Sequence, residues 1–200
     1  NAIISISGNI EHGKALELVK KWFEDIPASS YTPENIPQEP RQTKENRLIV
    51  PDNNVPADAI YKVFHMGDRS SDDFYVCDII SDILSNGQSS RLYVNLIKNS
   101  RLFSGIDAYV SGDVDPGLFI FSGKLSEDTN IAVAENAINE EIEKFLHDDI
   151  SEFELQKVIN KIEARISYSE INYQTRAANL AFFEFLGDID LINNEAKRYK

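Results

Sequence analysis

Residues 85–93 of this chain, Ser-Asn-Gly-Gln-Ser-Ser-Arg-Leu-Tyr, separate two helical patterns and limit how the surrounding chain can fold. Before this stretch, apolar residues at three- and four-residue spacing predict a helix over 71–84. After it, the same spacing predicts a second helix over 90–99. The Asn-Gly pair can supply the positive φ that ends the first helix, and either of the two serines can cap the second. We therefore expect a sharp corner between two consecutive helices.

Two probable strands follow the second helix. Residues 102–110 and 117–125 have the composition of β-strands, and a Ser-Gly-Asp-Val-Asp-Pro segment over 111–116 joins them. Glycine, aspartate and proline in such a short segment are typical of a turn. The order of helix, glycine corner, helix and hairpin is compatible with few architectures.

This ordered set resembles the insulinase/pitrilysin-type zinc metallopeptidases, a family that also contains the mitochondrial processing peptidases. The resemblance rests on residues 87–93, 102–104 and 115–119. It extends to residues 1–10, which look like the strand and turn that open a domain of this family. The residues that match the family's glycine-corner motif are Gly87, Ser89, Ser90, Arg91 and Leu92.

Members of that family are built from paired, similar α+β domains around a chamber, and only one domain of each pair carries zinc. This chain resembles the zinc-free, inactive kind. The resemblance implies a domain that closes the chamber and binds an extended peptide, opposite a zinc-bearing homologous domain of the same polypeptide or of a partner subunit. The parent protein would be a zinc metalloendopeptidase, with no catalytic residue in this fragment. The alternative is a scaffold without a peptidase role, as some relatives serve in respiratory complexes.

Periodicity in the rest of the chain predicts further strands and helices. Strands are expected over 2–7, 47–50 and 57–66, and the last should be central because it carries bulky residues on both faces. Helices segregated from hairpin-joined strands indicate an α+β fold of two layers, with helices on one face of an antiparallel-rich sheet. The other expected helices cover 11–26, 129–147, a stretch from 152 and a stretch from about 173.

Length and composition are those of one domain. Two hundred residues, 42% of them hydrophobic, suffice for a single domain over 1–200 with a full core. Residues 27–46 lack periodicity and contain four of the seven prolines, so we interpret them as an internal connector rather than a domain boundary. The formal net charge of −13 argues against nucleic acid as a partner, and no apolar run reaches the ~18 residues of a membrane span. Because the chain opens on a strand and stops in a charged helical stretch, we expect an excised fragment.

Zinc is expected in the partner domain and not in this chain. The catalytic half of the family carries an inverted His-x-x-Glu-His, in which two imidazoles bind the metal and the glutamate acts as general base. The three histidines of this chain are His12, His65 and His147, and none lies within five residues of another. We therefore expect no metal site here.

Residues 8–14 match the Gly-x-x-x-x-Gly-Lys pattern of a phosphate-binding loop. Ala15 stands where serine or threonine would ligate magnesium, and Glu11 would place a carboxylate beside the phosphates. A tight strand-to-helix turn is therefore favoured, and nucleotide binding is a remote alternative.

In many members of the family the zinc-free half contributes an arginine and, seven residues later, a tyrosine that can stabilise the developing oxyanion. Matching on Leu102 places these positions at Ile97 and Ser104, so this chain has neither side chain. Arg101 and Tyr109 are close in sequence but out of register. We expect this domain only to form part of the chamber wall and bind the peptide. The alternative is that another part of the parent protein replaces the missing arginine and tyrosine.

Overall fold

The computed structural model describes residues 2–30, 37, 39–112 and 114–200, which divide into two compact units. One unit comprises Asn1–Lys44 and Ala164–Ala196, and the other comprises Glu45–Glu163 and Lys197–Lys200. The single domain over 1–200 stays a prediction. The described residues of the connector over 27–46 contain no helix or strand.

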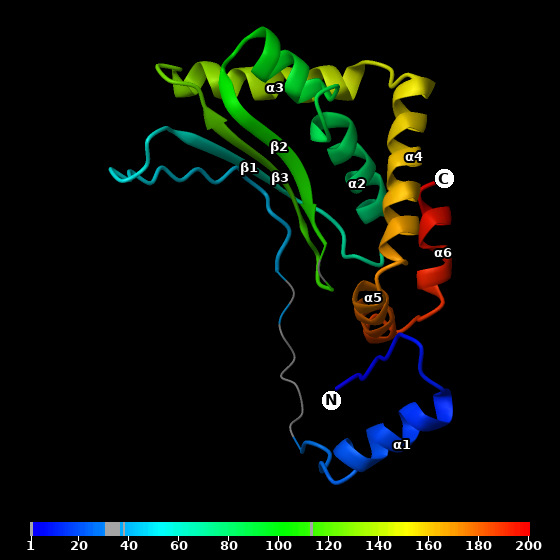
Figure 1. Cartoon of the computed structure of the whole chain (residues 1–200). Coiled ribbons are helices and arrows are strands. Elements are labelled where there is room, and N and C mark those ends of the chain that lie inside the picture. Colours follow the sequence, from blue (N-terminus) through cyan, green and yellow to red (C-terminus); the bar gives the residue numbers. More distant parts are fainter. Residues whose placement is uncertain (1, 31–36, 38, 113) are drawn as a thin grey trace. The chain divides into compact units, whose positions relative to one another are not determined.

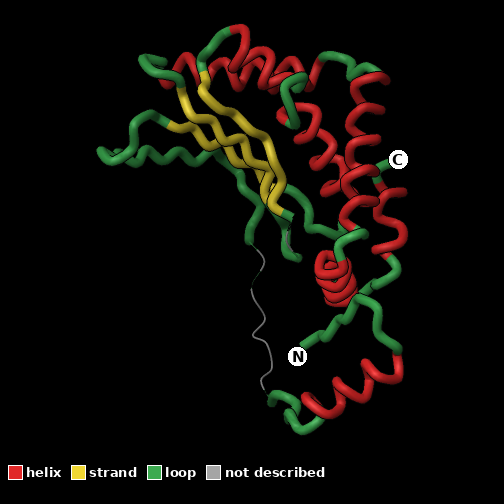
Figure 2. The backbone as a smooth tube through the Cα atoms, in the orientation of Figure 1, coloured by secondary structure: helices red, strands yellow, loops and turns green. Residues whose placement is uncertain are grey.

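The described part of the larger unit contains a three-stranded antiparallel sheet (Figure 2). Its strands are β1 (Ala59–His65), β2 (Phe103–Ser111) and β3 (Leu118–Leu125), in the order β1-β3-β2. The expected hairpin is confirmed as the β2–β3 pair. The prediction that residues 57–66 form the central strand is wrong, because β3 pairs on both sides and β1 lies at an edge.

Helices cover one face of this sheet. Figure 1 shows α2 (Asp72–Ser85), α3 (Ile131–His147) and the beginning of α4 (Glu152–Ser169) on the same side of the strands. Most sheet residues on the helical face are buried or half-buried, although Phe64 near the end of β1 is exposed. Alternate residues such as Tyr61, Val63 and Tyr109 are exposed on the other face. The α+β fold with helices on one face is therefore confirmed. The buried residues on the helical face include Ile60, Ile106, Ala108, Phe119 and Phe121.

Side-chain caps fix where the helices begin. Ser71 precedes α2 and accepts a hydrogen bond from the Phe74 N–H at 3.4 Å. Asn130 precedes α3 and accepts from the Ala132 N–H at 2.9 Å, so an N–H that the helix leaves unpaired is satisfied. The helix expected over 90–99 is present, but from Tyr93 to Asn99 it is a π-helix, η1.

The smaller unit holds helices α1 (His12–Phe23) and α5 (Tyr173–Phe185) and most of α6 (Leu191–Arg198). Asn172 caps α5 by accepting from the N–H groups of the second and third helical residues, at 2.9 and 3.1 Å. The helices expected in this part of the chain are therefore confirmed.

Two of the expected strands do not form. Residues 2–7 and 47–50 have no assigned β-structure, although their composition favours it. A strand exists only where a neighbour supplies ladder hydrogen bonds, and the described residues supply none to either segment. Both predictions were wrong, because they considered only each segment's own residues.

The last residues of the chain pack against α2. The Tyr199 hydroxyl donates to the Asp78 carboxylate at 2.8 Å, and both residues are buried. Arg198 donates to Asp72 at 2.7 Å, and its guanidinium lies 4.0 Å from the ring centre of Tyr75. These contacts explain why Lys197–Lys200 belong to the larger unit although they follow the smaller one in sequence.

Shortening the Leu92 side chain at the glycine corner should destabilise the protein strongly. Leu92 is fully buried, so Leu92→Ala should lower the free energy of unfolding by roughly 2–5 kcal/mol through lost burial and a new cavity. Leu146→Ala, at a leucine of α3 that is 67% exposed, is the matched control and should change it by less than about 0.5 kcal/mol. Denaturant unfolding measures both, and equal losses would contradict the assignment of Leu92 to the core.

Candidate functional site

Gly87 makes the corner between α2 and the next helix. Its φ is 101°, a conformation that L-residues with side chains rarely adopt, so the positive φ expected here is confirmed. The Ser90 hydroxyl donates to the Gly87 carbonyl at 2.7 Å, and Ser90 is 2% exposed. Ser90 therefore stabilises the corner from its buried side, through a hydrogen bond to a carbonyl rather than to a helix N–H.

Helix α4 holds the corner from outside. Arg91 makes a two-bond pair with Glu154: its Nε donates to Oε1 at 3.0 Å and its Nη2 to Oε2 at 2.7 Å. These hydrogen bonds lower the pKa of the Glu154 carboxyl and raise that of the Arg91 guanidinium. The guanidinium also lies 5.3 Å from the ring centre of Phe145. Arg91 thus connects the corner to both α3 and α4.

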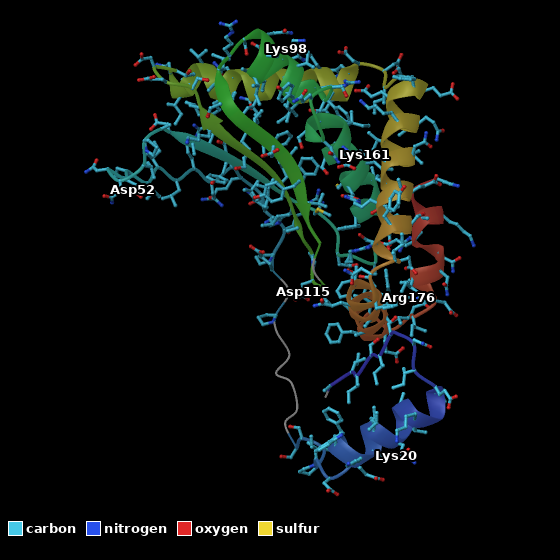
Figure 3. All side chains as sticks on the ribbon, viewed as in Figure 1. Lys20, Asp52, Lys98, Asp115, Lys161 and Arg176 are labelled. Carbon is cyan, nitrogen blue, oxygen red and sulfur yellow. The ribbon has the colours of Figure 1, made fainter. Side chains whose placement is uncertain are left out.

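Two lysines of α4 approach the same corner. Lys157 donates to the Ser89 hydroxyl at 3.2 Å, and Lys161 donates to the backbone and side-chain oxygens of Asn86. Figure 3 shows Lys161 on the side of α4 that faces α2. Sequence reasoning missed Glu154 and these lysines. The available signal was their spacing of i, i+3 and i+7, which places all three on one helical face.

Helix η1 and α3 line an open pocket of about 430 Å³. Glu141 is 4% exposed, and its carboxylate accepts from the Asn95 amide at 2.6 Å and from Lys144 at 2.7 Å. The bond to Glu141 raises the pKa of Lys144. Because both oxygens of the buried carboxylate are paired, this cluster stabilises the contact between η1 and α3.

The two positions that the resemblance assigned to substrate contact lie at either end of the η1–β2 connection. Ile97 is half-buried on η1. Ser104 is exposed at a β-bulge, because Phe103 pairs with Leu125 while Gly105 pairs with Lys124. Its hydroxyl lies 3.2 and 3.3 Å from the carbonyls of Lys124 and Leu125, to which it donates. The family role of both positions stays a prediction.

Arg101 adopts a φ of 56° between η1 and β2. A residue with a side chain rarely occupies this left-handed region. Arg101 is exposed, so the strain is not offset by burial of its side chain. The turn therefore reverses the chain tightly, and Arg101 is at a position that glycine would occupy more easily.

The two edges of the sheet differ. At one end of β1 the Leu125 N–H donates to the Asp58 carbonyl, and at the other end the Met66 N–H donates to the Gly117 carbonyl. Because bonded residues alternate along an antiparallel strand, the even-numbered residues of β1 bond to β3. The backbone groups of Val63 and His65 therefore point to the outer edge of β1, which pairs with no other described strand.

The outer edge of β2 is occupied. The Ser85 hydroxyl of α2 donates at 2.8 Å to the Ala108 carbonyl, which points away from β3. Because a helix side chain already satisfies this group, an incoming strand would compete with α2. The outer edge of β1 is therefore the place where this sheet can accept a further strand.

No three His, Cys, Asp or Glu side chains in the described ranges are close enough to hold a metal ion. His12 begins α1, His65 ends β1 and His147 ends α3, where its ring lies 3.4 Å from the Glu143 carboxylate.

The glycine-lysine pattern lies on the turn before α1. Lys14 reaches forward along the helix and contacts both carboxylate oxygens of Glu17 at 3.0 Å. Gly8 has a φ of 152°, and no atom lies within 4 Å of where its Cβ would be. Lys14 thus points along α1 in this structure rather than over the turn, which favours the tight-turn interpretation.

The family profile described as "Peptidase M16 inactive domain" matches residues 1–162. This chain belongs to that family. The insulinase/pitrilysin resemblance is thereby confirmed, including its assignment to the inactive kind of domain. In the described part of the chain, no helix is both long and apolar enough to cross a membrane.

Known proteins resemble this chain over nearly its whole length. The curated relative "Zinc protease PqqE" of Helicobacter pylori is 24% identical over 194 residues, which are 96% of this chain and 43% of that protein. A crystal structure of a protease from Helicobacter pylori superposes with a TM-score of 0.88 at 20% identity, over 96% of this chain and 47% of the other. A chain in the structure of Complex III2 from Candida albicans superposes with a TM-score of 0.77 at 14% identity, over 96% of this chain and 47% of the other. This M16 inactive domain therefore spans less than half the length of these relatives.

The pair between Arg91 and Glu154 should make stability depend on pH. Because the folded-state pKa of Glu154 is lowered, the pair stabilises the fold above the carboxyl's unfolded pKa of ~4.3, and this contribution is lost as pH falls through the folded pKa. Glu154→Gln should therefore cost about 1–3 kcal/mol at neutral pH and progressively less in acid. The control Glu152→Gln changes an exposed carboxylate of the same helix. Unfolding curves at several pH values measure the free energy of unfolding of both variants. A loss of stability in Glu154→Gln that does not change with pH would exclude the ion pair as its source.

Proposed function

We propose that this M16 inactive domain closes the chamber of a zinc metalloendopeptidase and binds an extended peptide there. Its catalytic partner would be a zinc-bearing homologous domain, in the same polypeptide or in a partner subunit. The observation that carries this proposal is the family match over residues 1–162. The length of the relatives supports it, since each has more than half of its chain outside the matched part. In this arrangement zinc and the general base belong to the partner domain, and this chain contributes binding surface.

The edge of β1 is the place where we expect the peptide to bind. An extended peptide can add to a sheet edge as a further strand, with backbone hydrogen bonds for affinity and side-chain contacts for selectivity. Val63 and His65 direct their N–H and C=O groups to this edge, and both side chains lie on the exposed face of the sheet. The peptide backbone would bond to these groups without displacing any ladder bond to β3.

This chain has isoleucine and serine at the positions where the resemblance places the arginine and tyrosine of many relatives. Ile97 gives no charge to a developing oxyanion, and the Ser104 hydroxyl is already directed at two backbone carbonyls of the β-bulge. We therefore assign the domain a binding role rather than a direct role in transition-state stabilisation.

A scaffold without peptidase activity is the second candidate. It is favoured by the similarity in fold to a chain of Complex III2 from Candida albicans. The two candidates differ in one measurable property, because only the first requires that the purified parent protein cleave peptides and lose that activity when zinc is chelated.

Proline at the β1 edge should weaken peptide binding selectively. Val63→Pro removes an N–H that points away from β3, so the ladder is kept, and proline is tolerated at such edge positions. Loss of one backbone hydrogen bond of about 1 kcal/mol should raise KM by about fivefold and leave kcat nearly unchanged. Peptide cleavage by the parent protein is the assay.

The matched control is Val63→Ala, which shortens the side chain and keeps the N–H. It should raise KM less than Val63→Pro does. Equal KM values for the proline variant and the unmodified protein, with the fold intact by circular dichroism, would exclude strand addition at this edge.

The two family positions allow a separate test in the parent protein. Ser104→Ala should cost about 0.5–1.5 kcal/mol through the lost hydroxyl hydrogen bonds and leave turnover per folded molecule unchanged. Combining Ile97→Arg with Ser104→Tyr should raise turnover if both positions face the chamber, since a lost oxyanion donor typically costs about 10²–10³ in rate. Complete loss of turnover in a folded Ser104→Ala protein would show that Ser104 takes part in catalysis.

A further inference from the structure

The open pocket between η1 and α3 combines apolar and polar lining residues. The apolar ones are buried or half-buried, and they are Leu96, Leu102 and Ala137. Several polar ones are exposed at the rim, among them Asn99, Ser100 and Glu140. A volume of about 430 Å³ lies in the size range of small-ligand sites, so the pocket can take a whole side chain of a bound molecule.

The pocket carries one more negative than positive side chain, because its charged lining residues are Glu140, Glu141 and Lys144. The two oxygens of Glu141 already accept from Asn95 at 2.6 Å and from Lys144 at 2.7 Å. Glu140 makes no hydrogen bond or salt bridge with any described residue and acts on Lys144 only at longer range. Its charge is therefore left without a direct partner, and it favours a cation at the rim of the pocket.

The Lys144 ammonium shows which kind of group these carboxylates hold. Arginine and lysine side chains combine an apolar stem with a charged head. In this pocket the stem would pack against Leu102 and Ala137, and the head would donate to the Glu140 carboxylate. A guanidinium has five N–H donors in one plane, so it can also reach the amide oxygen of Asn99. A carboxylate ligand would instead be repelled by both glutamates.

We propose that this pocket holds an arginine or lysine side chain of the peptide that the domain binds, with Glu140 as the specificity-determining residue. This inference rests on the proposed function, because it names the class of residue that the domain selects in the peptide. The lining residues of the η1–β2 connection fall between Ile97 and Ser104, the positions that the family resemblance places at the substrate. The formal net charge of −13 also favours the approach of a basic peptide.

A divalent metal ion fits the same pocket less well. Such ions take six or more oxygen ligands, or four ligands that include histidine or cysteine. The pocket offers two carboxylates, and one of them already holds Lys144. Over the described ranges, no three His, Cys, Asp or Glu side chains form a group that could bind a metal. The cation is therefore a side chain rather than a metal.

Peptide binding to the purified parent protein tests the assignment. Two short fluorescein-labelled peptides of alanine and serine differ only at one central position, which holds arginine or citrulline. Citrulline keeps the shape of arginine and lacks its charge. Fluorescence anisotropy, read in the cold before cleavage accumulates, gives the Kd of each peptide. We expect the arginine peptide to bind about fivefold more tightly, as is typical of one hydrogen bond to a charged group at a partly exposed site.

Two variants of α3 then locate the source of this preference. Glu140→Gln should reduce it to less than about twofold, because the amide keeps the shape of the side chain and loses the charge. Glu143→Gln is the matched control. It removes the same charge from the same helix, at a side chain that is 68% exposed and does not line the pocket. This variant should keep the full preference for arginine.

Three results would overturn the proposal. Equal affinities of the two peptides for the unmodified protein would exclude a pocket for a basic side chain. An equal loss of preference in Glu140→Gln and Glu143→Gln would indicate only general attraction to an acidic protein. If the peptides bind alike and Glu140→Gln alone lowers the melting temperature, a basic residue of the parent protein fills the pocket instead. Failure of the proposed function is seen separately, as a parent protein without chelator-sensitive cleavage or one that binds neither peptide.

Discussion

The two-bond pair between Arg91 and Glu154 connects the parts on which the rest of the larger unit depends. It joins the glycine corner to α4, and the Arg91 guanidinium also lies against Phe145 of α3. The side chains are about 20% exposed, so solvent screens the pair less than it would a surface ion pair. With Gly87 turning the chain and Leu92 buried, this pair positions η1, and η1 leads directly into the β2–β3 hairpin.

The two outer edges of the sheet differ in whether their backbone groups are already hydrogen-bonded. Helix α2 ends at the glycine corner, and Ser85, at its last turn, bonds to the outer edge of β2. Among the described residues, no helix side chain bonds to the outer backbone groups of Val63 and His65. An exposed edge risks unwanted pairing, so an open one is more readily understood as a binding site than as an accident of the fold. In the proposed function, the open edge would hold a peptide backbone while the chemistry takes place in another domain.

The sequence by itself determined the local features. Periodic apolar residues defined the helices, Asn86-Gly87 defined the corner, and the widely spaced His12, His65 and His147 left no zinc motif. These features depend on residues within about one turn of each other, which is the range that sequence patterns describe. Only the tertiary structure decided that β1 is an edge strand, that residues 2–7 and 47–50 have no ladder partner, and that Glu154 pairs with Arg91 across 63 positions. Strand order and long-range ion pairs depend on which distant segments meet in space, and the composition of one segment does not contain that information.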